Sequence, residues 1–377
     1  MGTRKKSAAG ISTAVMAVVM VVSLTLAGVF AVLYIAAAKT AAQLRSENER
    51  LQAEAAVTAF STDVNAVNPD NANEGETALP DLGSSENIDE LLVEKELEVE
   101  DSIKQKMKEL VVSDDGSPLK MLRAFFPENL IYYDEEEYVF APVNDSLKMH
   151  SILQENLVEN DNGEMEYIEN GVVTSHKGID VSKYQGNIDW QKVKENGIEY
   201  AFIRLGIRGY GTGKLALDEY FEENMSGAAQ AGIETGIYFF TQAVNEAEAV
   251  EEAQFVLENI AQYDVKCPIV FDVELIPNDD SARANGLTME ERTDIAIAFC
   301  EEVKGAGYTP MIYGNIKCFT KLLDMERIED YEKWYAFYDD YMYFPYEVSC
   351  WQYTEKGRVG GVRGNVDLNI SYEKLWE

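Results

Sequence analysis

From Gly178 to the end of the chain, two hydrophobic patterns alternate. Short apolar runs rich in β-branched and aromatic residues indicate buried strands, and longer segments with apolar residues every three or four positions indicate helices. This alternation is typical of an α/β fold built on a mainly parallel sheet. The predicted strands are 178–182, 199–206, 233–241, 267–274, 309–314, 333–338, 348–352 and 365–370. The predicted helices are 189–196, 217–231, 246–262, 289–306 and 316–323.

The last third of this region is less regular than the rest. After Trp334 the predicted strands follow one another with too few residues between them for helices. Eight strands with about five helices therefore predict an irregular TIM-like barrel over residues 177–377. In such barrels, the loops at the carboxyl ends of the strands build the active site.

The chain opens with a basic head, which contains Arg4, Lys5 and Lys6, and an apolar run over residues 8–38. A helix needs about 20 residues to span a bilayer, and this run is longer. It is also longer than the core of a signal peptide, which has about 7–15 residues. We expect residues 1–38 to be a cytoplasmic head and a single-pass membrane anchor, with everything after Lys39 outside the cell. Cleavage at the alanine-rich stretch, followed by secretion, is the less favoured alternative.

Two connecting segments follow the anchor. Residues 39–86 begin as a juxtamembrane helix and continue as a stretch rich in Asn, Asp, Ser, Glu and Ala without periodicity. That composition predicts a flexible linker. Residues 87–112 place apolar side chains near one face of a helix and predict an amphipathic helix.

Residues 113–176 predict a small β-rich module. One hairpin is expected around the acidic turn after Tyr133, and a second around Asn170 and Gly171. No chemistry is evident in this segment, so a packing or spacer role is favoured over binding.

The charge and the histidine count exclude several functions. A formal net charge of −35 argues against nucleic acid as a partner, because nucleic-acid-binding proteins carry basic patches. It also argues against long-range attraction to anionic polymers. Only two histidines are present, His150 and His176, and both precede the barrel. Catalysis by Ser-His-Asp or Cys-His groups and HExxH zinc sites are therefore excluded from the barrel.

The cysteine pattern does not indicate a metal site. Cys267, Cys300, Cys318 and Cys350 show no CxxC spacing, so a thiolate metal site is not expected. Disulfides and four free, buried thiols both remain open. We expect no metal and no cofactor.

The clearest candidate chemistry lies at the end of the fourth predicted strand. Asp272 and Glu274 are two residues apart, so their side chains project to the same side of the strand, while Phe271 and Val273 face the other side. Their Cα atoms would be roughly 6.6 Å apart, which suits two carboxyl groups that act on one substrate. Like charges at this distance raise the pKa of one group and keep it protonated as an acid.

Two further acids lie on the strands that must meet when the barrel closes. Asp180 is on the first strand and Asp367 is on the last. Closure therefore predicts that Asp180, Asp367, Asp272 and Glu274 surround one cavity. Four acids without histidine indicate either hydrolysis of a glycoside by paired carboxylates or a divalent-cation site.

Aromatic side chains at the strand ends favour a sugar substrate over a cation. Tyr238, Phe240 and Gln242 share one face of the third strand, and Trp334 and Tyr338 share one face of the sixth. Such rings beside hydrogen-bonding groups match the apolar faces and hydroxyl edges of sugars. The predicted substrate-binding residues are Tyr238, Phe240, Gln242, Arg204, Tyr313, Trp334, Tyr338 and Trp351.

A glycine-rich segment gives a weak nucleotide-binding signal. Gly211, Gly213 and Ala216 fit G-x-G-x-x-A, with Glu234 about 20 residues further on. However, Glu234 opens the next predicted strand, whereas a ribose-binding acid should close it. We therefore interpret this segment as a flexible loop close to the cavity.

Residues 178–376 resemble glycoside hydrolase family 25, the lysozymes of the N-acetylmuramidase type. The motifs are DVSKYQG at 180–186, IDW at 188–190, IR at 203–204, RGYGTG at 208–213, GIYFF at 236–240, FDVE at 271–274, WQ at 351–352 and VDLN at 366–369. The resemblance implies cleavage of β-1,4 bonds after N-acetylmuramic acid in peptidoglycan. It implies that Glu274 is the general acid/base, Asp272 its partner carboxylate, and Asp180 and Asp367 supporting acids. A non-catalytic wall-binding scaffold on the same barrel is the alternative, and a metal-dependent wall hydrolase is a weaker one.

Overall fold

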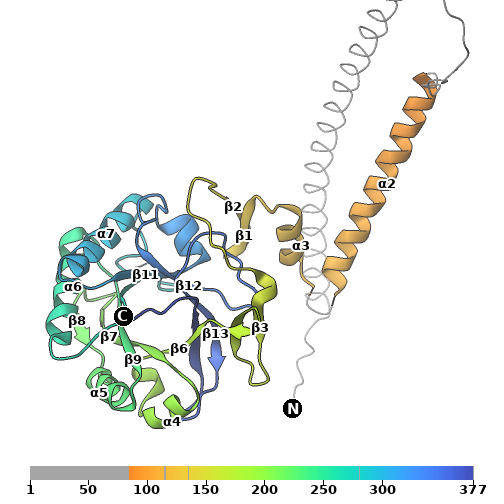
Figure 1. The fold of residues 1–377 in the computed structure, drawn as a ribbon. Coiled ribbons are helices and arrows are strands. Elements are labelled where there is room, and N and C mark those ends of the chain that lie inside the picture. The colour runs from red at the N-terminus through yellow and green to blue at the C-terminus, as the bar shows by residue number, and fades with distance from the viewer. Residues whose placement is uncertain (1–84, 114–115, 135, 280, 377) are drawn as a thin grey trace, which may run out of the picture. The chain divides into compact units, whose positions relative to one another are not determined.

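Eight strands close into a barrel in the computed structural model, which describes residues 85–376 apart from 114, 115, 135 and 280 (Figure 1). Around the barrel the order is β6-β14-β13-β12-β11-β10-β9-β7, and β6 pairs with β7 to close it. The strands are β6 (His176–Val181), β7 (Tyr200–Arg208), β9 (Glu234–Phe240), β10 (Ile269–Asp272), β11 (Pro310–Asn315), β12 (Glu332–Ala336), β13 (Cys350–Gly357) and β14 (Val366–Ser371). All pairings among them are parallel except those of β14, which is antiparallel to both of its neighbours. Only residues 358–365 connect β13 to β14, too few for a crossover helix, so the chain reverses direction there.

Helices alternate with the strands and lie outside the barrel as far as β12 (Figure 1). They are α4 (Trp190–Glu195), α5 (Phe221–Ala231), α6 (Glu246–Ile260), α7 (Met289–Gly305) and a short π-helix (Cys318–Leu322). The starts of α6 and α7 are set by local sequence, because the side chains of Asn245 and Thr288 cap their first turns. The predicted eight-stranded barrel with about five helices is thus confirmed within the described residues.

Several predicted boundaries differ from the structure by two or more residues, and two of these differences change the interpretation of the sequence. Helix α5 begins at Phe221, not at residue 217, because residues 215–217 form a short ninth strand, β8 (Leu215–Leu217), that pairs with β7 as a hairpin. The glycine-rich segment is the turn of this hairpin and opens no helix, so it lacks the strand–helix context of a dinucleotide-binding turn. Strand β10 ends at Asp272, two residues earlier than predicted, and Glu274 lies at the start of the following loop.

The barrel has separate inner and outer cores. The interior is filled by aromatic and aliphatic side chains of alternate strand positions, including Tyr200, Phe202, Val270, Met311 and Trp334. Trp334 stacks on Phe202 with ring centroids 4.4 Å apart. The outer core lies between the strands and the surrounding elements, and it contains Phe271 and Val273. All four cysteines are buried and free.

The N-terminal module, residues 113–176, packs against the barrel and also contacts the π-helix, where Thr320 and Lys321 donate hydrogen bonds to Tyr132 and Asp134 of the module. It contains α3 (Pro118–Phe125), β1 (Asn129–Asp134), β2 (Glu137–Pro142), a 3-10 turn (Gln154–Asn156), β3 (Leu157–Glu159), β4 (Met165–Glu169) and β5 (Val172–Val173). Both predicted hairpins are present, and Asn170 and Gly171 adopt φ angles of 52° and 79°, as a two-residue type I′ turn requires. Leu130, Tyr132 and Met165 of the module join the same core as Trp351 of β13. The module therefore covers apolar strand faces that the helices leave open.

Helix α2 (Ser85–Val112) corresponds to the predicted amphipathic helix over residues 87–112. The predicted anchor and the predicted linker up to residue 84 lie outside the described residues, and residues 85 and 86 of the predicted linker belong to α2. Among the helices that the structure describes, none combines the length and apolar character needed to cross a membrane. The domain boundaries remain predictions.

Candidate functional site

The four predicted acids meet at the carboxyl end of the barrel. Asp180 on β6 and Asp367 at the start of β14 are directly paired across the two strands. Asp272 is the last residue of β10, and Glu274 follows two residues later. Asp367 reaches this end because β14 runs antiparallel, which places its first residues beside the last residues of the parallel strands.

Burial and mutual repulsion raise the pKa of each acid. Burial raises the pKa of Asp180 to about 6, with a smaller contribution from the charge of Glu274. Burial and then the charge of Asp180 raise the pKa of Asp367 to about 8. Burial, followed by the charges of Glu274 and Asp180, holds the pKa of Asp272 well above its ordinary value. At neutral pH the group therefore does not carry four negative charges, and it retains protons that isolated carboxyl groups would lose.

Of the two candidate catalytic acids, Asp272 and Glu274, Glu274 is the more accessible to solvent. Its side chain is exposed, whereas that of Asp272 is only 4% exposed. Burial nevertheless raises the pKa of Glu274, and the charge of Asp367 raises it further, while Arg204 lowers it. The exposure of the side chain and the effect of burial on its pKa are compatible if protein surrounds the carboxyl group on most sides and leaves one side open. That is the position from which a side chain can exchange a proton with a substrate.

Asp180 is fixed by two buried amides. Gln352 Nε2 and Asn369 Nδ2 donate hydrogen bonds to Asp180 Oδ2 at 2.8 and 2.9 Å. Tyr313 and Tyr338 each donate a hydroxyl hydrogen bond to Gln352 Oε1, at 2.8 and 3.0 Å. These bonds set the orientation of the Gln352 amide, so its NH₂ group must face Asp180.

Asn369 is oriented in the same way, because Trp334 Nε1 donates a hydrogen bond to Asn369 Oδ1 at 2.8 Å. Trp334 is 2% exposed and forms the floor of the site. Tyr238 and Tyr313 pack edge-on against its ring at centroid distances of 6.1 and 4.6 Å. Three of the predicted substrate-binding aromatics therefore lie together beneath the acids.

Two buried polar side chains at this end of the barrel have no hydrogen-bond partner within the described residues. They are Asp272, whose Oδ1 atom is unpaired, and Gln242, whose Nε2 and Oε1 atoms are both unpaired. Gln242 is 0% exposed, and its segment is joined to β10 by a hydrogen bond from Thr241 N to Asp272 O at 3.2 Å. A buried polar group without a partner costs about 1–3 kcal/mol, so such groups usually have a functional reason. Hydrogen bonding to a bound ligand or to water would remove this cost.

Arg204 supplies a positive charge to the same site. Its guanidinium binds Asp218 Oδ2 through Nε at 2.8 Å and NH2 at 2.7 Å, and it lies over the ring of Tyr184, 5.1 Å from the centroid. Its charge lowers the pKa of both Asp272 and Glu274, against the larger effect of burial. Arg204 thus limits how far the two acids shift.

The remaining predicted residues differ in their placement. Phe240 pairs with Asp272 across β9 and β10, and Tyr338 is half exposed beyond the end of β12. Trp351 is not brought to the site, because it is 0% exposed in the outer core and donates its Nε1 hydrogen bond to Phe337 O. Adjacent strand residues face opposite sides, so Trp351 points outward where Gln352 points inward.

Sequence reasoning missed Gln352, Asn369 and Asp218. The signal for Asn369 was available, since it lies two residues after Asp367 and must share its strand face. No local signal identifies Asp218, which lies 14 residues after its partner Arg204.

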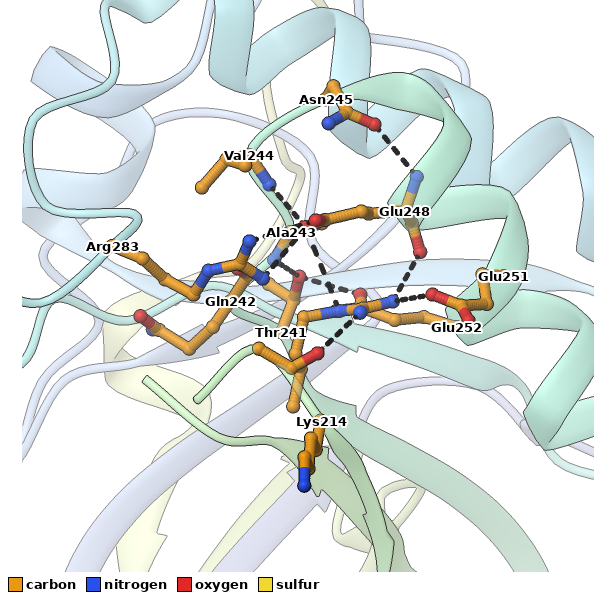
Figure 2. Close-up of polar contacts among 12 residues, drawn as sticks. Lys214, Thr241, Gln242, Ala243, Val244, Asn245, Glu248, Glu251, Glu252 and Arg283 are labelled. Carbon is orange, nitrogen blue, oxygen red and sulfur yellow. Dashed lines mark hydrogen bonds and ion pairs between the residues drawn. The ribbon is translucent and has the colours of Figure 1, made fainter. Parts of the chain in front are cut away.

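A partly buried cluster of ion pairs connects the segment of Gln242, the loop after β10 and the start of α6 (Figure 2). Arg208 Nε donates to Glu252 Oε1 of α6 at 2.7 Å, and both side chains are buried. Arg283, from the loop between β10 and α7, binds both carboxylate oxygens of Glu248 at 2.8 Å and contacts Gln242 O at 3.3 Å. The cluster therefore ties the Gln242 segment and the loop after β10 to the start of α6.

Part of the chain is similar to known proteins. Residues 179–362 match the family model of glycosyl hydrolases family 25. Lysozyme M1 of Streptomyces globisporus is 29% identical over 207 residues, which cover 51% of this chain and 66% of that protein. Uncharacterized protein YegX of Escherichia coli O157:H7 is also 29% identical, over 206 residues that cover 51% of this chain and 68% of that protein.

Among solved structures, the modular autolysin LytC of Streptococcus pneumoniae, in complex with a synthetic peptidoglycan ligand, is similar with a TM-score of 0.50 and 26% identity. The similarity covers 57% of this chain and 52% of that one. The chain thus spans about half the length of the autolysin.

Proposed function

We propose that residues 179–362, which match the family model of glycosyl hydrolases family 25, form a glycoside hydrolase of the lysozyme type, and that the chain cleaves peptidoglycan. The bond cut is the β-1,4 bond between N-acetylmuramic acid and N-acetylglucosamine. The observation that carries the proposal is the pair Asp272 and Glu274 at the open end of the barrel, where burial raises the pKa of both carboxyl groups. Paired carboxyl groups of this kind are the usual catalysts of glycoside hydrolysis.

In the proposed mechanism Glu274 is the general acid/base. Its proton passes to the glycosidic oxygen as the bond from that oxygen to the sugar C1 breaks. Asp272 holds the 2-acetamido group or stabilises the positive charge that develops at C1. The Glu274 carboxylate then takes a proton from water while the water oxygen bonds to C1. The proton that Glu274 gives to the leaving oxygen is replaced by the proton that it takes from water, so Glu274 is protonated again at the end of the reaction.

The other polar groups have supporting roles in this proposal. Asp180 raises the pKa of Asp272, Asp367 raises the pKa of Glu274, and Arg204 lowers both. Gln242, whose side-chain amide has no hydrogen-bond partner among the described residues, hydrogen-bonds the substrate. Tyr238, Phe240, Tyr313 and Trp334 form the apolar floor, and Tyr338 forms the rim.

Digestion of purified peptidoglycan by the full chain, followed by mass spectrometry of the new reducing ends, tests the proposed function. We expect N-acetylmuramic acid at the new ends. Glucosamine ends or cut peptides would give a different bond specificity. Binding to the wall material without any cleavage would favour the non-catalytic scaffold.

We further propose that the chain is anchored in the cell membrane with its N-terminus in the cytoplasm and its barrel outside. The basic head and the apolar run over residues 8–38 support this orientation. Protease added to intact cells from which the wall has been removed should degrade the barrel and leave an N-terminal stub. A barrel that stays protected until the cells are lysed would contradict the orientation.

A further inference from the structure

A cavity of about 390 Å³ lies between the N-terminal module and the barrel. The module contributes the end of the β3–β4 hairpin, with Glu159, Gly163 and Met165. The barrel contributes the ends of β12 and β13, including Tyr338, Asp340 and Glu355. Both of these strands are parallel and end at the carboxyl face, so the cavity opens on the same face as the acids.

The cavity shares a wall with the proposed active site. Tyr338 lines the cavity, and its hydroxyl group donates to the Gln352 amide that binds Asp180. Glu355 lines the cavity too, and its charge contributes to the raised pKa of Asp367. A substrate that reaches the acids along this side therefore passes Tyr338 and meets the hairpin.

The hairpin wall is held in place by polar contacts at its base. Asn160 Oδ1 accepts hydrogen bonds from the backbone of Asn162 and Glu164, at 2.9 and 3.1 Å, and thereby shapes the turn. Lys177, in β6 of the barrel, bridges Glu164 and Glu166 at 2.7 and 2.9 Å. These partly buried ion pairs fix the turn to the first barrel strand. The wall is therefore formed before any ligand arrives.

The same wall is joined to the barrel at a second point. Gln154, just before β3, accepts a hydrogen bond from Met342 N at 3.1 Å and donates to Asp340 O at 3.4 Å. The loop after β12 is thus tied to the module on one side while Tyr338 is tied to Gln352 on the other. The cavity and the acids consequently have a fixed relative position.

The charge of the cavity selects its ligand. Four carboxylates line it, Glu159, Asp339, Asp340 and Glu355, against the single cation Lys356, which lies 3.9 Å from Glu355. Among the described residues, Glu159 and Asp340 have no ion-pair partner. Such a lining attracts an ammonium group and repels phosphate-bearing polymers.

We propose that the β3–β4 hairpin is a wall of the substrate site, and that the cavity receives the ammonium-bearing peptide branch carried by the glycan beside the bond that is cut. This inference rests on the proposed function, since only a peptidoglycan substrate brings such branches to the barrel. The N-terminal module then determines substrate preference as well as covering the barrel, which goes beyond the packing role predicted for it.

Two glycopeptides test the inference, one with a free ammonium group on its peptide branch and one with that amine acetylated. We expect the full chain to show a KM about fivefold lower for the free amine at low salt, with equal kcat, as a pair of exposed charge contacts provides. The double variant Glu159→Gln/Asp340→Asn should lose this preference, and its Tm should be unchanged because both side chains are exposed. The matched control is Glu169→Gln, an exposed glutamate at the far end of β4, which should keep the preference.

Binding of both glycopeptides, measured by calorimetry, gives a second readout that does not need turnover. The preference should weaken as ionic strength rises. Equal KM and equal affinity for the two glycopeptides would overturn the inference, as would a double variant that keeps the preference. Cleavage of neither glycopeptide would instead contradict the proposed function, and the binding data would still decide the role of the hairpin.

Discussion

Replacing Glu274 with glutamine is expected to lower the rate of peptidoglycan cleavage by about 10²–10⁴-fold, the usual contribution of a general acid or base. Glutamine keeps the size of the side chain and removes the exchangeable proton. Because Glu274 is exposed and makes no described hydrogen bond that folding would lose, Tm should change little. Initial rates on solubilised glycan measure the loss.

The matched control is Glu258→Gln, an exposed glutamate on the outer surface of α6, which should retain full activity. The pH profile adds a second check. Since the pKa of Glu274 is raised, the acid stays protonated to higher pH, and activity should fall only as pH rises through that value. Near-normal activity in Glu274→Gln would assign the acid role to another residue.

The second large effect is expected for Asp272→Asn, at about 10²–10³-fold in kcat, the range seen when one electrostatic stabiliser of a transition state is removed. Asn has the same shape as Asp but no negative charge for the developing positive centre. If Asp272 acts through the 2-acetamido group, de-N-acetylated glycan should also resist cleavage by the unchanged enzyme. Activity of the variant equal to that of the parent would remove Asp272 from the mechanism.

The same variant should separate catalysis from stability. The pKa of Asp272 is higher in the folded protein than in the unfolded chain, so folding loses stability as pH rises above the unfolded pKa. Asn carries no such cost. At neutral pH the Tm of Asp272→Asn should therefore equal or exceed that of the parent while its activity falls. A lower Tm would indicate that a loss of folding contributes to the loss of activity.

The pH profile of Asp272→Asn tests the link between the two acids. The charge of Glu274 raises the pKa of Asp272, and an interaction between two titrating groups acts on both. Removal of the Asp272 charge should therefore move the basic limb of the profile to lower pH. An unchanged limb would show that burial and Asp367 alone set the pKa of Glu274.

The sequence by itself determined the order and type of the barrel elements. Apolar periodicity placed all eight strands, because a buried strand and an amphipathic helix each require a repeat that is local to the segment. Helix starts such as Asn245 and Thr288 are equally local, since the cap and the turn that it closes lie within four residues. Strand alternation also placed Asp272 and Val273 on opposite sides. The structure agrees, because Val270, two residues before Asp272, lies in the inner core and Val273 lies in the outer core.

Only the tertiary structure decided how distant side chains pair. Gln352 and Asn369 bind Asp180 from 172 and 189 residues away, through a strand order that closes β14 against β6. The sequence also did not reveal that Trp351 faces outward. A shift of one residue in strand register moves every side chain to the opposite face, and the local propensity for a strand is the same in both registers.

The position of the N-terminal module was likewise set by tertiary packing. Its hairpins were predicted from turn residues, but their partner surface includes the apolar face of Trp351 on β13, which no helix of the described residues covers. The hydrophobic effect is not directional, so the sequence of an apolar strand face does not indicate which segment will cover it. The cavity between Glu159 and Tyr338 arises from that contact and therefore could not be found in either segment alone.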